Sequence, residues 1–241
     1  MDDQEAVVAQ ALRVVTERFP HALGAVLGGS AAQGRATATS DLDVAVLLPD
    51  SDTSRREVIR HDGRIVELFL NTLADVPEFF AWDRARRRGT VLFVYGQGLP
   101  LADPHGHVAR ARQLAKDVLA SGPPALTATE WEHGRYVLTC FLDDLIDTPS
   151  DNRYEQLSLA DQVLRKAADL VTAHHSAWAG MGKWLPRRLL SADPSLGKAL
   201  LDGHRVVAEH ADPRPLATAV KQALDLFGGP LMEGYAHRWR G

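Results

Sequence analysis

GGSAAQGRATATSDLD, residues 28–43, places a glycine-rich turn directly ahead of two carboxylates separated by one leucine. A short apolar run at 22–29 leads into this stretch, and a second apolar run at 41–49 closes with a proline. Apolar runs of this length, bounded by glycine and proline, are typical of buried strands. The stretch therefore predicts a strand, a glycine-rich turn, and a second strand that begins with Asp41 and Asp43.

The two aspartates share one face of the second strand. Side chains alternate between the faces of a strand, so the Cα atoms of Asp41 and Asp43 lie roughly 6.5–7 Å apart. The other face is apolar and is expected to pack on helices; it carries Leu42, Val44, Val46 and Leu48. Two carboxylates held this close repel each other unless a cation lies between them. Mg2+ suits such a site, because it accepts a few carboxylates and keeps positions for water and phosphate oxygens.

A third carboxylate interrupts the apolar segment RIVELFLN at 64–71. Glu67 shares a face with Ile65 and Phe69, where a buried strand normally carries another apolar side chain. If this strand lies beside 41–49, Glu67 points to the same place as the two aspartates. Three acidic side chains on neighbouring strands are typical of two-metal phosphoryl chemistry, with the ions about 3.5–4 Å apart.

The glycine-rich turn is suited to a phosphate ligand. Gly28 and Gly29 let the backbone approach a ligand closely, and Ser30 offers a hydroxyl and can begin a short helix with free N–H groups. No Gly-Lys-Ser/Thr follows, which excludes a Walker-type loop. Too few residues separate Gly34 from Asp41 for the helix of a dinucleotide-binding βαβ unit.

Composition limits the class of protein. The chain has 241 residues, of which 45% are hydrophobic and 24% charged, and a net charge of −4, which is ordinary for a globular protein. Acidic and basic residues are balanced in both halves, which disfavours a dedicated polynucleotide binder. The single cysteine, Cys140, excludes an internal disulfide framework, and the acidic start MDDQEAVVAQ is unlike a signal peptide. Because no apolar run approaches about 20 residues, we expect a soluble cytoplasmic protein without a membrane partner.

The first half of the chain mixes helix and strand patterns. Asp62 and Gly63, between two β-rich runs within 56–71, are a strong hairpin signal. The other segments predict helices at 4–19, 73–89 and 104–122 and a further strand at 90–96. We expect an α+β fold here, with a small mixed sheet flanked by helices.

The strand patterns end near residues 121–126. Helical periodicity then predicts helices at 127–147, 152–178, 186–191, 195–210 and 213–227. His174 falls on the apolar face of its helix and is expected to be packed in the core. We therefore expect two domains, with residues 1–122 as the α+β domain and 123–241 as an all-α helical bundle.

GGSAAQGRATATSDLDVAVLL resembles the signature of the DNA polymerase β-like nucleotidyltransferase superfamily, which is Gly-Ser, a glycine a few residues later and Asp-x-Asp in a strand. Glu67 matches the third acidic residue, which the family carries on a later strand. The resemblance covers residues 22–70 specifically and 73–96 loosely. The helical second half looks like that of aminoglycoside and minimal nucleotidyltransferases. The resemblance thus implies a nucleotidyltransferase catalytic domain at 1–122 and a helical substrate-binding domain at 123–241.

The resemblance also implies a role for each matched residue. Gly29 and Ser30 would hold the β- and γ-phosphates of a nucleoside triphosphate. Asp41 and Asp43 would bind Mg2+, with two ions expected, and Glu67 would ligate the second ion and help to deprotonate the acceptor. Such enzymes move a nucleoside monophosphate onto an acceptor hydroxyl and release pyrophosphate.

Two basic residues are further nucleotide-binding candidates. Related enzymes place a lysine of the helical domain on the triphosphate, and Lys183 in AGMGKWLPRRLL is the matching candidate here. A helix start with a basic solvent face is the alternative interpretation of that segment. Arg35, directly after Gly34, could also contact phosphate.

The sequence thus favours Mg-dependent transfer of a nucleoside monophosphate, with ATP as the expected donor, to a hydroxyl of a small molecule such as an aminoglycoside-like antibiotic. The acidic side chains of helix 127–147 would attract a cationic acceptor, or else form a solvated face; they are Glu132, Asp143, Asp144 and Asp147. Two alternatives stay open. One is a toxin-type nucleotidyltransferase that acts on tRNA or a protein side chain, and the other is a non-catalytic nucleotide-binding scaffold.

Overall fold

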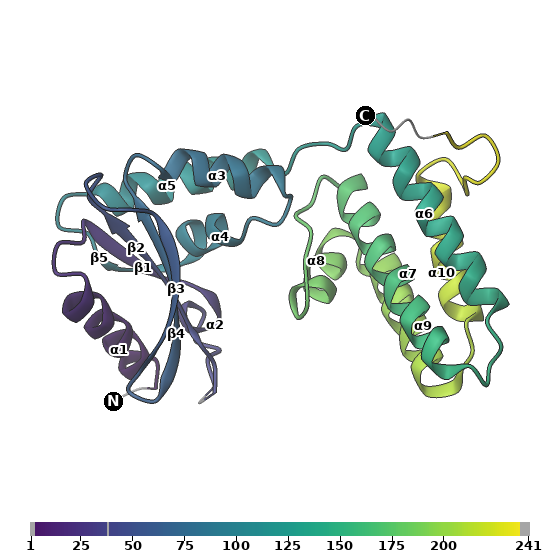
Figure 1. Ribbon diagram of the computed structural model, residues 1–241, viewed down its shortest axis with the longest axis horizontal. Helices are drawn as coiled ribbons and strands as arrows, with labels where there is room; N and C mark the ends of the chain where they lie inside the picture. Colours follow the sequence, from purple (N-terminus) through teal and green to yellow (C-terminus); the bar gives the residue numbers. More distant parts are fainter. Residues whose placement is uncertain (1–2, 38, 237–241) are drawn as a thin grey trace. The chain divides into compact units, whose positions relative to one another are not determined.

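The computed structural model describes residues 3–37 and 39–236 (Figure 1). The chain divides into two compact units, Met1–Pro123 and Pro124–Gly241. The first combines a sheet with helices, and the described residues of the second form helices joined by loops, with no strand among them. This confirms the predicted fold class of a small mixed sheet flanked by helices, followed by a helical bundle.

A mixed sheet forms the centre of the first unit, with its strands in the order β3-β4-β2-β1-β5. The strands are β1 (Gly24–Leu27), β2 (Leu42–Leu48), β3 (Arg55–His61), β4 (Arg64–Thr72) and β5 (Leu99–Ala102). β2 and β4 run parallel, and the other neighbouring strands run antiparallel. β2 therefore lies in the middle of the sheet, which explains why its sequence is apolar on both faces beyond the aspartates.

Helices cover both faces of this sheet (Figure 1). α1 (Asp3–Arg18) packs on one face, and the predicted apolar side of β2 lies in the core beneath it together with Val14 and Val15. α4 (Thr90–Gln97) and α5 (His107–Ser121) contact strands from the other face, and α3 (Val76–Ala85) packs on these two helices. Asp43 lies on the α4 side of the sheet, because its neighbours Leu42 and Val44 both point into the core under α1.

The predicted hairpin is confirmed. β3 and β4 pair antiparallel around Asp62 and Gly63, whose φ angles are +47° and +79°. Two successive residues with positive φ are typical of the turn that matches the twist of a two-stranded hairpin. This turn fixes the register of β4 against β3.

The prediction of a strand at 90–96 was wrong, because this segment forms α4. An apolar run of this length does not distinguish a strand from a buried helix by periodicity alone. Here the carboxylate of Asp83, near the end of α3, favours the helix. Its Oδ2 accepts hydrogen bonds from the backbone N–H groups of Val91 and Leu92, at 2.7 and 3.0 Å. These groups have no partner within a helix, so Asp83 caps α4 from outside it.

The second unit is built from helices α6 (Ala128–Asp147), α7 (Arg153–His174), α8 (Trp184–Ala192), α9 (Pro194–His210) and α10 (Arg214–Leu226). α6 begins with a capping box, in which Thr127 and Glu130 each bind the other's backbone N–H. The helices enclose one apolar core, to which α6, α7, α9 and α10 all contribute leucines. The prediction of a buried His174 was wrong: its side chain is exposed, with the ring 5.6 Å from that of Phe227.

Among the described residues, the structure contains no helix that combines the length and the apolar character needed to cross a membrane.

Candidate functional site

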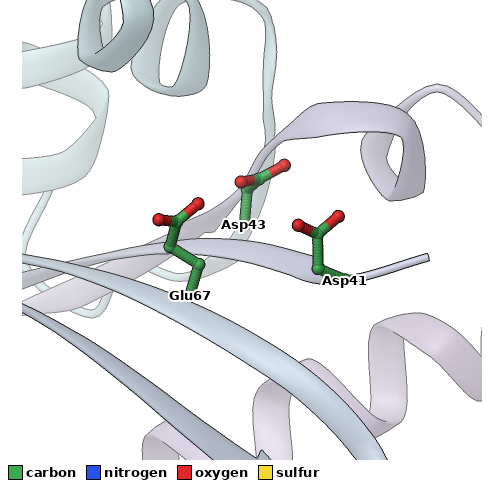
Figure 2. Close-up of side chains that lie close together, drawn as sticks. All are labelled: Asp41, Asp43 and Glu67. Atoms are coloured by element: carbon green, nitrogen blue, oxygen red, sulfur yellow. The ribbon is translucent and has the colours of Figure 1, made fainter. Parts of the chain in front are cut away.

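Asp41, Asp43 and Glu67 come together in the first unit. Each offers one carboxylate oxygen, and these oxygens all lie within 4.8 Å of one another. Figure 2 shows the three carboxylates pointing into the same space beside β2. None of the three side chains is fully buried, so a ligand from solvent can reach them. We call these three residues the acidic cluster.

The parallel pairing of β2 and β4 creates the acidic cluster. In this register Asp43 is the partner of Glu67, and Leu42 is the partner of Val66. Leu42 and Val66 both lie in the core under α1. A shift by one residue would turn this apolar set out of the core, so burial of one face fixes where the carboxylates on the other face lie.

The glycine-rich turn lies directly against the acidic cluster. The backbone N–H of Gly28 donates to the carbonyl of Asp43 at 2.7 Å. Gly29 has a φ of +62°, and a Cβ atom at this position would overlap Oδ2 of Asp43. Gly29 is therefore needed both for its left-handed backbone and for the close approach of the turn to a carboxylate.

Ser30 belongs to the short helix α2 (Gly29–Ala32), as the sequence predicted. Its carbonyl accepts the backbone N–H of Arg35 at 2.9 Å, so the turn folds back on itself at that point. The guanidinium of Arg35 is exposed and hydrogen-bonds to Oε1 of Gln33. Arg35 thus lies on the glycine-rich turn itself, close in the chain to the acidic cluster.

Lys183 belongs to the second unit. It precedes α8, its side chain is exposed, and it stands beside Trp184. The guanidinium groups of Arg187 and Arg188 lie over the Trp184 ring, at 4.9 and 5.2 Å from its centroid. Burial lowers the pKa of Arg188. The start of α8 is accordingly a basic and aromatic segment.

Two arginines beside the acidic cluster were missed by the sequence reasoning. Nη1 of Arg64 donates to the carbonyls of Thr37 and Ser40, at 3.1 and 3.0 Å, and so ties the loop ahead of Asp41 to the start of β4. Arg56 in β3 forms an ion pair with Oε1 of Glu67. The position of Arg56 could have been predicted from the hairpin turn. The turn makes Val58 the partner of Glu67, which places Arg56 two residues away on the same face.

The acidic cluster fits a hard divalent cation. It supplies carboxylate oxygens, which are the ligands that Mg2+ and Ca2+ prefer, and among the three residues there is no nitrogen or sulfur ligand of the kind that zinc favours. Mg2+ is commonly held by a small number of carboxylates together with water and phosphate oxygens. Asp41 directly before β2, Asp43 within β2 and Glu67 in the neighbouring strand β4 meet that requirement.

Comparisons with known proteins identify a family match within the first unit and a similar solved structure. Residues 8–88, which include the glycine-rich turn and the acidic cluster, match the model of the family described as nucleotidyltransferase domain. The structure is similar, at 13% sequence identity and a TM-score of 0.45, to a nucleotidyltransferase-like protein from Exiguobacterium sibiricum 255-15. The similarity covers 91% of this chain and 74% of that one. No curated protein matches the chain. The match at residues 8–88 supports transfer of a nucleoside monophosphate in general, and the protein is an enzyme of the transferase class.

Proposed function

We propose that the protein transfers a nucleoside monophosphate from ATP to a hydroxyl group of a small cationic molecule, such as an aminoglycoside-like antibiotic, in the presence of Mg2+. The observation that carries this proposal is the meeting of three carboxylates within 4.8 Å, inside a nucleotidyltransferase domain and against a glycine-rich turn. Nucleotidyl transfer needs this combination, because the triphosphate is anionic and must be held and neutralised at the same point.

Asp41, Asp43 and Glu67 would hold two Mg2+ ions, with Glu67 on the second. When bound, these ions neutralise charge on the phosphate oxygens and stabilise the attacking and leaving oxygens. The acceptor oxygen forms a bond to the α-phosphorus, and the bond from that phosphorus to the pyrophosphate oxygen breaks. Glu67 helps to take the proton of the acceptor hydroxyl, for which it needs to lie within hydrogen-bond reach.

The glycine-rich turn would bind the triphosphate. The carboxylate of Asp43 lies directly against Gly29, so a phosphate held by the turn would lie beside the acidic cluster. Ser30 offers its hydroxyl to the β- and γ-phosphates, and Arg35 can reach the same anion from the end of the turn. Lys183, before α8, is the remaining candidate for a cation on the triphosphate. These four residues form the proposed nucleotide-binding set.

The second unit would bind the acceptor. Its acidic helix face ends in a hollow of about 450 Å³ that is lined in part by Asp144, Asp147 and Glu155. These carboxylates give the hollow the charge that an amine-bearing molecule requires. The balanced charge of the whole chain weighs against a polynucleotide acceptor. The free thiol of Cys140 fits a reducing cytoplasm as the place of action.

A thermal-shift measurement tests the proposal first. A non-hydrolysable ATP analogue with Mg2+ is expected to stabilise the folded wild type by about 2.7 kcal/mol at a hundredfold excess over Kd. Its melting temperature should therefore rise. The double variant Asp41→Asn/Asp43→Asn should lose this rise. The absence of any rise with each of the four triphosphates would reject the proposed nucleotide site.

Pyrophosphate release then identifies the acceptor. Release that depends on an aminoglycoside supports the proposed substrate class. Release that requires tRNA or a protein substrate instead would show that the chemistry is right and the acceptor class is wrong.

A further inference from the structure

Arg56 is the basic neighbour of the acidic cluster. It lies in β3, at the edge of the sheet, opposite Phe69 of β4. Its guanidinium is 5.1 Å from the centroid of the Phe69 ring and forms an ion pair with Oε1 of Glu67. The pair therefore spans the two strands diagonally, on the face that carries the acidic cluster.

Arg60 offers a direct comparison with Arg56. Both arginines lie on the same face of β3, two residues to either side of Val58, which is the register partner of Glu67. Arg60 nevertheless directs Nη1 to the carbonyl of Gly63, at 2.8 Å, in the hairpin turn. Two residues of equal charge thus lie at equal spacing from the partner of Glu67, but Arg56 forms the ion pair with Glu67 and Arg60 binds the hairpin turn.

The ion pair reduces the electrostatic repulsion within the acidic cluster. Three carboxylates whose oxygens lie within 4.8 Å repel one another, and the repulsion is strongest when no cation lies among them. The guanidinium of Arg56 offsets part of that charge at Glu67, whose side chain is only 17% exposed. A divalent cation that binds the same carboxylates is therefore repelled by the positive charge of Arg56 beside it.

The exposure of Arg56 makes this arrangement reversible. Its side chain is 62% exposed, and ion pairs this open to solvent contribute little to stability. The guanidinium can therefore leave the carboxylate at small cost, while its contact with the Phe69 ring keeps it beside the site.

We propose that Arg56 is a positioning residue that holds Glu67 when no ion is bound and lowers the affinity of the acidic cluster for a divalent cation. This inference rests on the proposed function, because it takes the acidic cluster to be a metal site. Arg56 acts through Glu67 and through its charge, so a lysine at this position should largely replace it, whereas a neutral side chain should not.

A titration of the full chain with Mn2+, with free Mn2+ followed by electron paramagnetic resonance and no nucleotide present, tests the inference. In Arg56→Gln we expect Kd to fall by about threefold to tenfold, because a nearby positive charge is removed. Arg56→Lys and the matched control Arg60→Gln should stay within about twofold of the wild type. Since the guanidinium is exposed, raising the ionic strength should narrow the gap between Arg56→Gln and the wild type.

An equal or higher Kd in Arg56→Gln would overturn the inference. So would an equal fall in Kd in Arg60→Gln, because the effect would then belong to overall charge and not to the ion pair. The failure of the proposed metal site gives a different result, in which neither the wild type nor Asp41→Asn/Asp43→Asn binds Mn2+. Far-ultraviolet circular dichroism and melting curves of each variant confirm that the comparison is made between folded proteins.

Discussion

Asp43 and Glu67 are register partners across the parallel strands β2 and β4, and a glycine with left-handed backbone lies against the first of them. This relationship links two segments that are separated in the chain by strand β3. It brings carboxylates from two apolar strands together on one face of the sheet, where they can bind a cation. The predictions below follow from this geometry and from the contacts that support it.

Replacing Glu67 by Gln should abolish most of the activity without unfolding the protein. The amide keeps the shape of the side chain but neither binds a cation as strongly nor takes a proton, so we expect kcat to fall by about 10² or more. Pyrophosphate release at saturating ATP measures this. Glu57→Gln is the control, because Glu57 lies one strand away and pairs with Arg55 at 2.7 Å. Equal activity in the Glu67 and Glu57 variants would contradict a role for Glu67 in the reaction.

Gly29→Ala should inactivate the enzyme through a steric effect on Asp43. The new Cβ would overlap Oδ2 of that carboxylate, and the left-handed φ of +62° adds a strain of about 1–2 kcal/mol. Gly63→Ala separates the two effects, because Gly63 has a φ of +79° and a Cβ there meets nothing within 4 Å.

Both glycine variants are thus expected to lose about 1–2 kcal/mol in urea unfolding from the backbone strain alone. Only Gly29→Ala should also lose ATP turnover. If Gly63→Ala lost turnover to the same extent, backbone strain and not the contact with Asp43 would be responsible.

Asp83→Ala should destabilise the first unit. The carboxylate is 2% exposed and accepts two backbone N–H groups at the start of α4, so its removal leaves buried donors unpaired. The expected loss in the free energy of unfolding is about 1–3 kcal/mol. The matched control is Asp117→Ala, since the carboxylate of Asp117 is exposed and accepts from Gln113. Equal unfolding midpoints for the two variants would mean that Asp83 does not hold α4 in place.

The stability of the second unit should depend on pH through Asp212. Hydrogen bonds from the side chain and the backbone N–H of Arg214 lower the pKa of Asp212 to about 2. A carboxyl whose pKa is lower in the folded state contributes stability above its unfolded pKa of about 3.9 and loses it as pH falls through the folded value. The contribution should therefore be full near pH 6 and decline between about pH 4 and pH 2.

Nuclear magnetic resonance titration of the Asp212 carboxyl measures this directly, and Arg214→Gln is the control. We expect the midpoint in Arg214→Gln to move up toward the ordinary value, because the side-chain donors are removed. A midpoint that stays at its wild-type position in this variant would show that Arg214 is not the cause of the shift.

The sequence by itself determined the local parts of this protein. Alternation along residues 41–48 placed Asp41 and Asp43 on one face, and the Asp62-Gly63 turn produced the hairpin, because strand period and turn chemistry act over a few neighbouring residues. The helices of the second unit followed from their 3.6-residue period for the same reason. The glycine-rich turn and the carboxylate pattern were enough to indicate two-metal phosphoryl chemistry, and their resemblance to the nucleotidyltransferase signature implied nucleotidyl transfer.

Only the tertiary structure decided what depends on contacts between distant segments. The parallel register of Asp43 with Glu67 is set by burial of the apolar face under α1, and the helical state of α4 is set by the carboxylate of Asp83 from another helix. The ion pair of Arg56 with Glu67 requires both the hairpin register and the choice of one side-chain direction over another. Local sequence patterns do not predict these features, because each arises from packing between elements and not from the conformational preference of any one segment.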